Sequence, residues 1–454
     1  MRVNCNISAI IANNQLGKSE NSLSQAIERL SSGLKINHAK DDASGMAISK
    51  KMHAQIKALG QSSKNTQDGV SVVQTAESAL GEIENMLQRM RELAVQAASD
   101  TNGIVDREAL QAEIDQLAKE VDRISNDTEY NTMPLLDGTL SRRAYTDADN
   151  VEVYSMSDTV TTGEYTFSIT SAATRATYSF NDFTAATEAG SITINGASVS
   201  FEAGESKASI VGKLQNAADI GNTVFEASAT GMSVTNKLYG SNEKLNITFS
   251  SENIATMFTG SASTTVSTEG KDCEATLGAG FSPTANVVTS GNIVTVKDVN
   301  SFEIQIEAFD DAVHNDITVK VTELGVMGIQ AGANEGQQIN IDIPKVNMHT
   351  LGLDYINLRT GEHAGFAITK FDKAINTISS IRSKLGAFQN RLETTTKGLD
   401  EYEENITAGL SRIEDCDMAE EMTTFTAHNV KTQAATSILA QANERPESVL
   451  QLLQ

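Results

Sequence analysis

Two short patterns contain residue types that could carry out chemistry, and neither is complete. Residues 17–19 (Gly-Lys-Ser) resemble the end of a phosphate-binding loop, but that motif needs a glycine where this chain has Ala12. A calcium loop beginning at Asp147 would need an oxygen ligand where this chain has Val151, and no glycine follows. We therefore interpret the first segment as ordinary helix and the second as a solvated acidic turn.

The histidines and cysteines also form no recognisable site. The histidines are dispersed, with no pair at ligand spacing and no H-E-x-x-H motif. Cys5, Cys273 and Cys416 include no C-x-x-C pair, and three cysteines are too few for a disulfide scaffold. If helices at the two ends of the chain pair antiparallel, Cys416 lies roughly 50 Å from Cys5, so we expect free, buried thiols. The sequence predicts no metal site, no cofactor and no enzyme.

The composition of the chain argues against further classes of protein. The chain has 454 residues, 39% of them hydrophobic, and its formal net charge is −24. Such an acidic chain is a poor match for nucleic acid or for anionic lipid, both of which need basic surfaces. It contains no apolar run of about 18 residues, and its first residues have no apolar core of a secretory signal. We expect a soluble protein without a cleaved signal peptide.

Long helices are predicted at both ends of the chain by seven-residue repeats of apolar residues. On the N-terminal side the repeat stops at 102–103 (Asn-Gly) and resumes at Leu110. Its first part comprises Val73, Ala76, Leu80, Ile83, Leu87, Met90, Ala94 and Ala97. On the C-terminal side, Phe371, Ile378, Leu385, Leu392, Leu399, Ile406 and Ile413 recur every seven residues, interleaved with Ile381, Phe388, Thr395 and Tyr402. This spacing predicts coiled-coil packing between long helices.

The outermost segments have weaker apolar stripes. They comprise Leu23, Ile27, Leu30 and Leu34 at one end and Ile438, Leu439, Val449, Leu450, Leu452 and Leu453 at the other. Helices that bury so little are marginal alone, so we expect them to become ordered on partners.

The middle of the chain changes to a two-residue period. Alternating apolar residues occur around Phe167, Ile304 and Val319, and Asn195-Gly196 lies between two such runs as a hairpin turn. We expect an antiparallel β insertion over about 140–328, with one helix near 207–218 and few contacts across its boundaries. The predicted fold class is α+β: the N- and C-terminal helices pair into a coiled-coil or helical-bundle rod with terminal inner helices, and an antiparallel β domain is inserted.

Several stretches resemble bacterial flagellins. They are Arg29-Leu-Ser-Ser-Gly-Leu-Lys-Ile-Asn37, Ala39-Lys-Asp-Asp-Ala-Ser-Gly45, Gln67–Leu80, Leu87–Gln96, Leu135-Leu-Asp-Gly138, Leu385–Leu392, Asp417–Glu421 and Leu439–Asn443. They occur in the family's order through about 1–139 and 329–454. The resemblance implies an inner helical domain (1–40 and 414–454), a helical rod domain with a β-hairpin segment (41–139 and 329–413), and a solvent-facing variable domain (140–328).

The resemblance also implies a function. Flagellins leave the bacterial cell unfolded through the flagellar export channel and polymerise into the extracellular filament that drives motility. The implied partners are other flagellin subunits, an export chaperone, cap and hook-junction proteins, and the host Toll-like receptor for flagellin. The terminal stripes, together with Leu385 and Leu392, would then serve filament assembly and core packing.

Gln88, Arg89, Leu93 and Glu113 match family positions that contact this receptor. Alternative roles are structural: Leu93 would pack on a second helix or a neighbouring subunit, and Arg89 would pair with Glu92 or Glu82. In the 29–45 stretch, Gly33 and Gly45 would permit a bend, and Asp41 and Asp42 would cap the following helix.

Two other functions remain open. A hook–filament junction or cap-type axial protein shares the helical ends, and micrographs of the purified protein would distinguish it from a filament subunit. A flagellin frame carrying an inserted zinc peptidase would need the H-E-x-x-H motif that this chain lacks.

Overall fold

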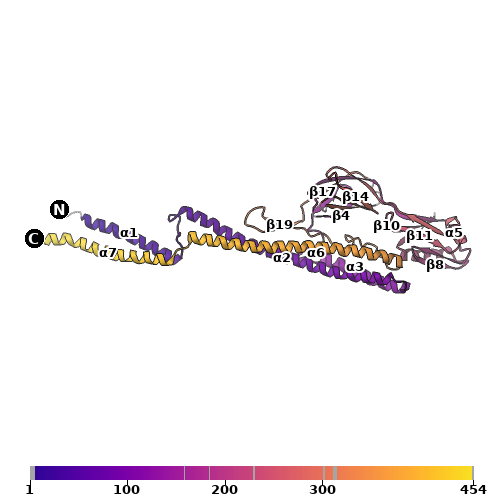
Figure 1. Cartoon of the computed structure of the whole chain (residues 1–454), viewed down its shortest axis with the longest axis horizontal. Coiled ribbons are helices and arrows are strands. Elements are labelled where there is room, and N and C mark those ends of the chain that lie inside the picture. The colour runs from indigo at the N-terminus through magenta and orange to yellow at the C-terminus, as the bar shows by residue number, and fades with distance from the viewer. Residues whose placement is uncertain are drawn as a thin grey trace. The chain divides into compact units, whose positions relative to one another are not determined.

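The computed structural model describes residues 6–157, 159–183, 185–228, 231–299, 302–309 and 314–451. Its helices are α1 (Ile7–Ser32), α2 (Ala43–Ala97), α3 (Ile104–Asp127), α4 (Lys207–Ile220), α5 (Glu252–Thr259), α6 (Gly361–Glu414) and α7 (Met418–Gln451). Figure 1 shows α1 beside α7, and α2 beside α6. No helix in these ranges is long and apolar enough to cross a membrane.

The chain forms two compact units. The first contains Met1–Asp68, Gln330–Gln338 and Leu392–Gln454, and the second contains Gly69–Ile329 and Ile339–Arg391. The boundaries between these units fall within the long helices, at other positions than the boundaries of the three domains expected from the sequence. Those three domains stay a prediction.

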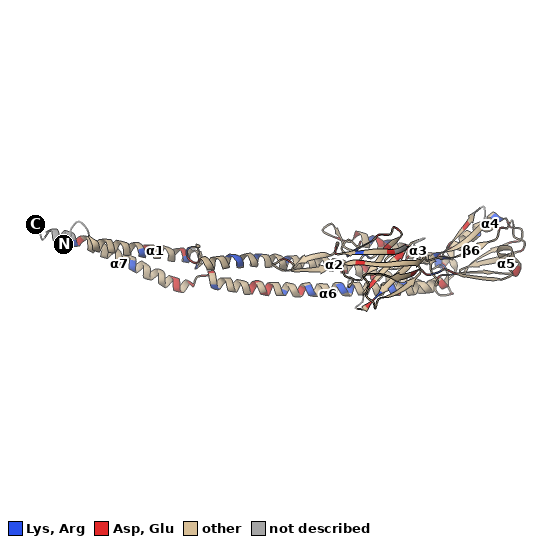
Figure 2. Ribbon diagram, turned by 90° about the horizontal axis from the view of Figure 1, so that it is seen from above, with Lys and Arg blue, Asp and Glu red and all other residues tan. Residues whose placement is uncertain are grey.

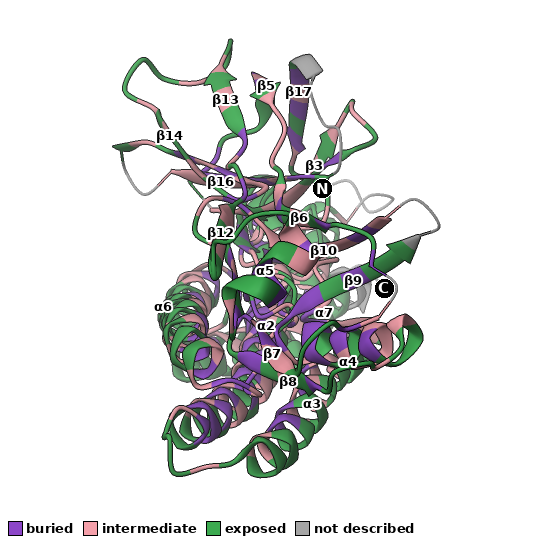
Figure 3. Ribbon diagram, turned by 90° about the vertical axis from the view of Figure 1, so that its right-hand side faces the viewer, coloured by how far each residue is buried: buried purple, intermediate pink, exposed green. Residues whose placement is uncertain are grey.

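The seven-residue repeat predicts the buried face of the second unit's long helices. All eight apolar positions from Val73 to Ala97 in α2 are fully buried, as are Phe371 and Ile378 in α6. Viewed along the helices, buried positions lie on one side of α3 and of α6, and exposed positions on the other (Figure 3). The predicted break after α2 is also present, because α2 ends at Ala97 and α3 starts after Gly103.

All strands of the described residues occur in the sequence between α3 and α6. They are β1 (Glu129–Tyr130), β2 (Met133–Pro134), β3 (Arg143–Thr146), β4 (Val151–Met156), β5 (Gly163–Ser171), β6 (Arg175–Phe180), β7 (Gly190–Ile194), β8 (Ala197–Phe201), β9 (Thr223–Ser228), β10 (Gly231–Tyr239), β11 (Lys244–Phe249), β12 (Thr265–Glu269), β13 (Glu274–Leu277), β14 (Asn286–Ser290), β15 (Ile293–Lys297), β16 (Glu303–Ala308), β17 (His314–Thr322), β18 (Met327–Gln330) and β19 (Gln338–Ile341).

The larger sheets build two separate cores. Sheets β13-β5-β17-β3 and β14-β15-β16-β4 enclose one apolar cluster that includes Phe167, Ile304 and Val319. Sheets β6-β10-β9 and β12-β11-β7-β8, with α4 and α5, enclose a second cluster around Phe258. The predicted α+β class with an antiparallel insertion is therefore confirmed, and the insertion has two cores.

Local predictions in the insertion were mostly correct. In the β7–β8 hairpin Ile192 pairs with Val199, and the turn residues Asn195 and Gly196 have positive φ values of 44° and 86°. The predicted helix is α4. The sequence did not predict α5, because eight residues are too few to establish a helical period.

The insertion contacts the segment before α6 through a small set of polar pairs. The Nε2 atom of His349 lies 3.1 Å from Glu307 of β16, and its Nδ1 atom lies 2.6 Å from Asp354. Arg359 forms an ion pair with Asp219 at 3.0 Å. The pairs His349–Glu307 and Arg359–Asp219 join residues distant in sequence, which no local pattern reveals.

Candidate assembly and recognition surfaces

Helices α1 and α7 pack on each other through small side chains. The described residues of α1 that are buried are Ala12, Ser19 and Ala26, and on α7 Ala435 and Ala442 are 9% and 8% exposed. At the start of α1, Asn6 accepts a hydrogen bond from the backbone of Ala9 and donates one to the carbonyl of Ala442, 2.8 Å away. Small residues let the two helices approach closely, but they bury little apolar area.

Eight large apolar side chains of these helices are exposed, while others are half-buried. We call this set the outer apolar face: Ile7, Ile10, Ile11 and Ile27 on α1, and Met418, Met422, Val430 and Ile438 on α7. Each is between 48% and 64% exposed. A shallow apolar depression on α7 is lined by Met422, Thr423, Thr426, Ala427, Val430 and Lys431. Exposed large apolar residues that gather on two paired helices are typical of an interaction site.

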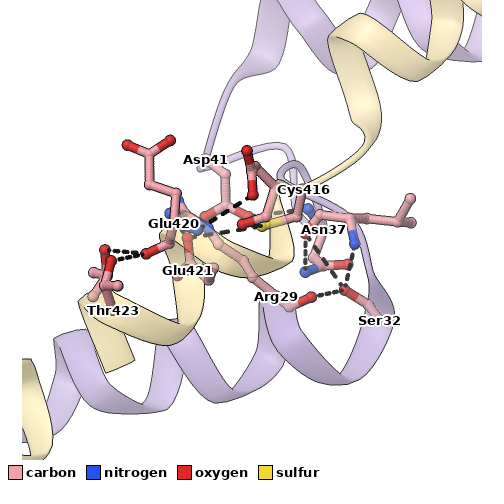
Figure 4. Close-up of polar contacts among 11 residues, drawn as sticks. Arg29, Ser32, Asn37, Asp41, Cys416, Glu420, Glu421 and Thr423 are labelled. Carbon is pink, nitrogen blue, oxygen red and sulfur yellow. Dashed lines mark hydrogen bonds and ion pairs between the residues drawn. The ribbon is translucent and has the colours of Figure 1, made fainter. Parts of the chain in front are cut away.

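The chain passes between α1 and α2 and between α6 and α7 at one joint, which is shown in Figure 4. Its two connecting segments pair antiparallel at Leu34 and Asp415. The Lys35 amide donates to the carbonyl of Glu414 at 2.6 Å, and the Cys416 amide donates to the carbonyl of Gly33 at 2.9 Å. Both changes of helix direction are thus fixed by backbone hydrogen bonds.

Charged side chains reinforce the joint. Arg29 of α1 lies 3.8 Å from Glu421 of α7, and His53 of α2 lies 2.8 Å from Glu414 at the end of α6. Asp41 accepts hydrogen bonds from the backbone amides of Asn37 and His38. The bond from His38 is the main reason why the pKa of Asp41 is lowered.

Glycine and aspartate residues determine where the helices at the joint end and begin. Gly33 terminates α1 with a φ of 73°, a backbone conformation that favours glycine. Asp42 accepts hydrogen bonds from the amides of Ser44 and Gly45 and so caps α2, whereas Asp41 stabilises the loop instead. Gly45 lies inside α2, where a side chain would collide with Ile36 and Asp42. The capping role expected for Asp41 and the bend expected at Gly45 were therefore wrong.

The thiols differ in exposure. Cys273 is buried, and burial raises its pKa to about 11. Cys416 is only partly buried, and its sulfur lies 3.8 Å from a carboxylate oxygen of Glu421. Burial and then this carboxylate raise the pKa of Cys416. The expectation of buried thiols was thus wrong for Cys416, and Cys5 lies outside the described residues.

The predicted receptor residues fall into two groups. Gln88 and Arg89 are exposed on α2 and Glu113 is exposed on α3. The guanidinium of Arg89 bridges the two helices, with Nη2 2.9 Å from Glu113 and Nη1 3.3 Å from Glu92. The hydrogen bond to Glu113 is the main reason why the pKa of Arg89 is raised. Arg89 therefore also pairs with Glu92, which was one of the structural partners expected for it.

Leu93 does not belong to this surface. Its side chain is 1% exposed, so the prediction that it anchors a partner directly is wrong for the folded monomer. The seven-residue repeat placed Leu93 just outside the seam between two helices. Such a repeat describes packing on one partner helix only, so it does not predict burial on the other sides of α2. The structural alternative considered for Leu93 agrees with this burial.

The structure places the predicted assembly residues in three environments. Leu385 and Leu392 are buried at 1% and 0% exposure. Leu23, Leu30, Leu34 and Leu439 are half-buried, and Ile27 and Ile438 are exposed. The side chain of Leu450 and the whole of Leu453 lie outside the described residues.

Arg382 links α6 to α2 and was not predicted. It bonds to Glu77 and Glu84 of α2, each with a nitrogen–oxygen distance of 2.5 Å. These hydrogen bonds raise the pKa of Arg382 above its usual value. Only the antiparallel alignment of the helices brings these residues together, so their sequence spacing gave no signal.

Comparison with known proteins identifies the chain. Residues 3–141 match the bacterial flagellin N-terminal helical region, and residues 368–453 match the bacterial flagellin C-terminal helical region. A flagellin of Clostridium tyrobutyricum is 34% identical over 447 residues, which is 98% of this chain and 100% of that protein. This chain belongs to the flagellin family.

Other relatives support the same assignment over nearly the full length. A flagellin of Salmonella typhimurium (strain LT2) is 32% identical, with 99% of both chains covered. A flagellin of Escherichia coli K12 is also 32% identical, covering 100% of this chain and 99% of its own. The solved structure of FliC from Burkholderia pseudomallei is 19% identical and covers 71% of this chain and 99% of its own, with a TM-score of 0.25. The matches to flagellin sequences show that this chain is a structural subunit of the bacterial flagellar filament.

Proposed function

We propose that this flagellin polymerises by burying the outer apolar face of α1 and α7 against neighbouring subunits. The observation that carries the proposal is that eight large apolar residues of these helices remain exposed although the helices pack on each other. Burying one Leu or Ile side chain contributes about 1.5–3 kcal/mol as an upper estimate. Several such residues in contact with neighbours would offset the entropy lost when the helices become ordered.

Asparagine substitutions on this face test the proposal. Ile11→Asn combined with Val430→Asn should prevent filament formation in electron micrographs while leaving the melting temperature of the monomer unchanged. Leu324→Asn is the matched control, because Leu324 is 63% exposed but lies in the insertion. Normal filaments from the double variant would contradict the proposed assembly face.

The proposal extends to the other partners of the terminal helices. We propose that an export chaperone covers the outer apolar face before assembly, and that cap and hook-junction proteins contact the same ends in the extracellular filament. Export through the flagellar channel belongs to this proposal, as does a structural role without enzyme activity.

We further propose that the host Toll-like flagellin receptor binds monomers at a receptor patch formed by Gln88, Arg89 and Glu113. These residues are exposed on two adjacent helices, and Arg89 and Glu113 already hold each other in position. As the family resemblance implies, neighbouring subunits would cover this side in the filament. Monomers should therefore bind the receptor and intact filaments should not.

A hook–filament junction or cap-type protein is the alternative function. Similarity to flagellins over 98–100% of the chain supports the filament subunit instead. Electron microscopy of the purified protein separates the two, because only a filament subunit should form micrometre-long filaments alone.

A further inference from the structure

Three large apolar residues gather at the start of α1. Ile7, Ile10 and Ile11 are 64%, 50% and 63% exposed, and spacings of three and four residues place them on one side of the helix. Ile10 precedes the buried Ala12 by two residues, which is about 200° around the helix axis. This isoleucine cluster, centred on Ile10, therefore projects from the side of α1 opposite to its buried side.

The apolar depression on α7 also lies opposite a buried residue. Thr426, in the middle of the depression, precedes the buried Ala435 by nine residues, which is about two and a half helical turns. Met422 and Val430, on either side of Thr426, are 49% and 60% exposed. The pair of helices thus has a projecting apolar cluster on the outer side of α1 and an apolar depression on the outer side of α7.

The cluster and the depression lie at different levels along the two helices. Asn6 at the start of α1 donates a hydrogen bond to the carbonyl of Ala442 in α7, and the joint connects the opposite end of the pair. The helices therefore run antiparallel, and Ile10 is about level with position 438 of α7. Thr426 lies about 12 residues closer to the joint, which is roughly 18 Å at 1.5 Å per residue. The isoleucine cluster therefore does not reach the depression of its own chain.

A second copy of this chain is the partner that this offset fits. Subunits of an open helical polymer contact each other through two different surfaces, and successive subunits are displaced along its axis. Residues 7–17 and 422–430 contain no Asp, Glu, Lys or Arg, although the whole chain has a net charge of −24. Figure 2 shows α1 and α7 mostly in tan, with few charged positions. Two copies can therefore meet at these surfaces without opposing charges of the same sign.

We propose that, in the filament, the isoleucine cluster of one subunit packs into the α7 depression of a parallel neighbour displaced by roughly 18 Å along the helices. The contact rests on the proposed polymerisation, and it adds which apolar surfaces meet and at what displacement. Each subunit has one cluster and one depression on opposite sides of the helix pair. The same contact therefore repeats from subunit to subunit instead of closing into a pair.

Cross-linking between two marked chains tests the displacement. In a Cys5→Ala/Cys416→Ala background, one chain carries Ile10→Cys and the other carries Thr426→Cys, and parent chain is added in equal amount so that filaments form. A short bismaleimide should join the two marked chains in filaments and not in mixed monomers. The control replaces the second chain by Ile438→Cys, because Ile438 is exposed and about level with Ile10.

Mass spectrometry of the linked peptides distinguishes the products. In filaments, the product that joins positions 10 and 426 should exceed the one that joins positions 10 and 438 by about tenfold, since the yield follows the effective concentration of the two thiols.

Filling the depression tests the fit separately. Ala427→Leu makes this part of α7 more apolar but occupies the space for the neighbour's isoleucines, and overfilled contacts are destabilised. It should raise the concentration of unassembled protein at equilibrium about tenfold, which corresponds to about 1.4 kcal/mol per subunit. Ala440→Leu is the matched control, because Ala440 is exposed on the same helix beyond the depression. It should stay within about twofold of the parent. Circular dichroism should show an unchanged melting temperature of both monomers.

The outcomes distinguish this contact from polymerisation itself. Equal amounts of the two cross-linked products in filaments would overturn the proposed displacement, and with it the contact. Ala427→Leu that assembles like Ala440→Leu would overturn the packing of isoleucines into the depression. Both results leave polymerisation standing, because the parent chain forms filaments in each experiment. A parent chain that forms none would overturn the proposed function and the contact together.

Discussion

Leu392 and Tyr402 lie on the same helix, α6, and differ completely in burial. Leu392 is 0% exposed and Tyr402 is 66% exposed. Leu392→Ala should lower the free energy of unfolding of the monomer by about 2–5 kcal/mol, because it leaves a cavity in the seam. Tyr402→Ala, the control, should change it by less than about 0.5 kcal/mol. Denaturant unfolding followed by circular dichroism measures both, and equal values would show that Leu392 is not a core residue.

Arg89 and Leu93 should affect receptor binding for different reasons. Arg89→Ala removes an exposed guanidinium from the receptor patch and should weaken monomer binding by more than about 1 kcal/mol, without a large change in melting temperature. Leu93→Ala should instead lower the melting temperature, because Leu93 is buried. Titration of the receptor with each folded variant measures binding. Parent-like binding by Arg89→Ala would remove Arg89 from the patch.

The two described thiols should react at different rates. In a Cys5→Ala background at about pH 8, iodoacetamide should label Cys416 in the folded monomer and leave Cys273 unlabelled, as read by mass spectrometry. Both pKa values are raised, but only Cys416 is accessible to the reagent. Both thiols should be labelled in denatured protein. Rapid labelling of Cys273 in the native monomer would contradict its burial.

The raised pKa of Cys273 also has a consequence for stability. An unfolded cysteine loses its proton at a lower pH than this one, whose pKa is about 11. Folding stability should therefore be complete below the unfolded pKa and should fall as pH rises through about 11. The fall should be smaller in a Cys273→Ala variant.

At the scale of single elements, α1 and α7 should change most during assembly. The most buried residues of their mutual contact are small, while eight of their large apolar residues are exposed. Backbone amides of both helices should exchange hydrogen rapidly in monomers and slowly in filaments, whereas residues 73–97 of α2 should be protected in both. Hydrogen-exchange mass spectrometry measures this. Strong protection of α1 and α7 in the monomer would contradict it.

The elements were predictable wherever one periodic pattern decides burial. The seven-residue repeat from Val73 to Ala97 identified fully buried positions, and alternation around Phe167 identified a core strand. Along α6 the interleaved stripe failed at Tyr402, since coiled-coil spacing alone does not show how far a partner extends. The joint at Leu34 and Asp415 was not predictable, because it pairs segments almost at opposite ends of the sequence.

At the scale of the whole molecule, sequence similarity and apolar pattern predicted the class but not the contacts between its parts. The burial of Leu93 and the bonds of Arg382 depend on helices that meet only in the folded chain. The link from His349 to Glu307 depends on an insertion with two cores. Such contacts are determined by tertiary packing, for which a single sequence carries no periodic signal.

The start and end of the insertion lie close together, which makes its removal a feasible test. The Arg143 amide donates to the carbonyl of Leu324 at 3.2 Å, and Gly325 lies beside the carbonyl of Thr139. Joining Thr139 to Ile329 through a short flexible linker should therefore leave the helices folded. The shortened chain should still polymerise, and electron micrographs should show a thinner filament.

Removal of the insertion should also have a local cost. The segment before α6 would lose the contacts of His349 with Glu307 and of Arg359 with Asp219, so residues 347–360 should exchange hydrogen faster in the shortened monomer. The full-length variant His349→Gln/Arg359→Gln is the control, because it breaks the same contacts but retains the mass of the insertion. It should share the faster exchange and keep the parent filament diameter. A shortened protein that is soluble and folded but forms no filaments would show that the insertion is required for assembly, and would contradict the assignment of assembly to the terminal helices and their neighbours alone.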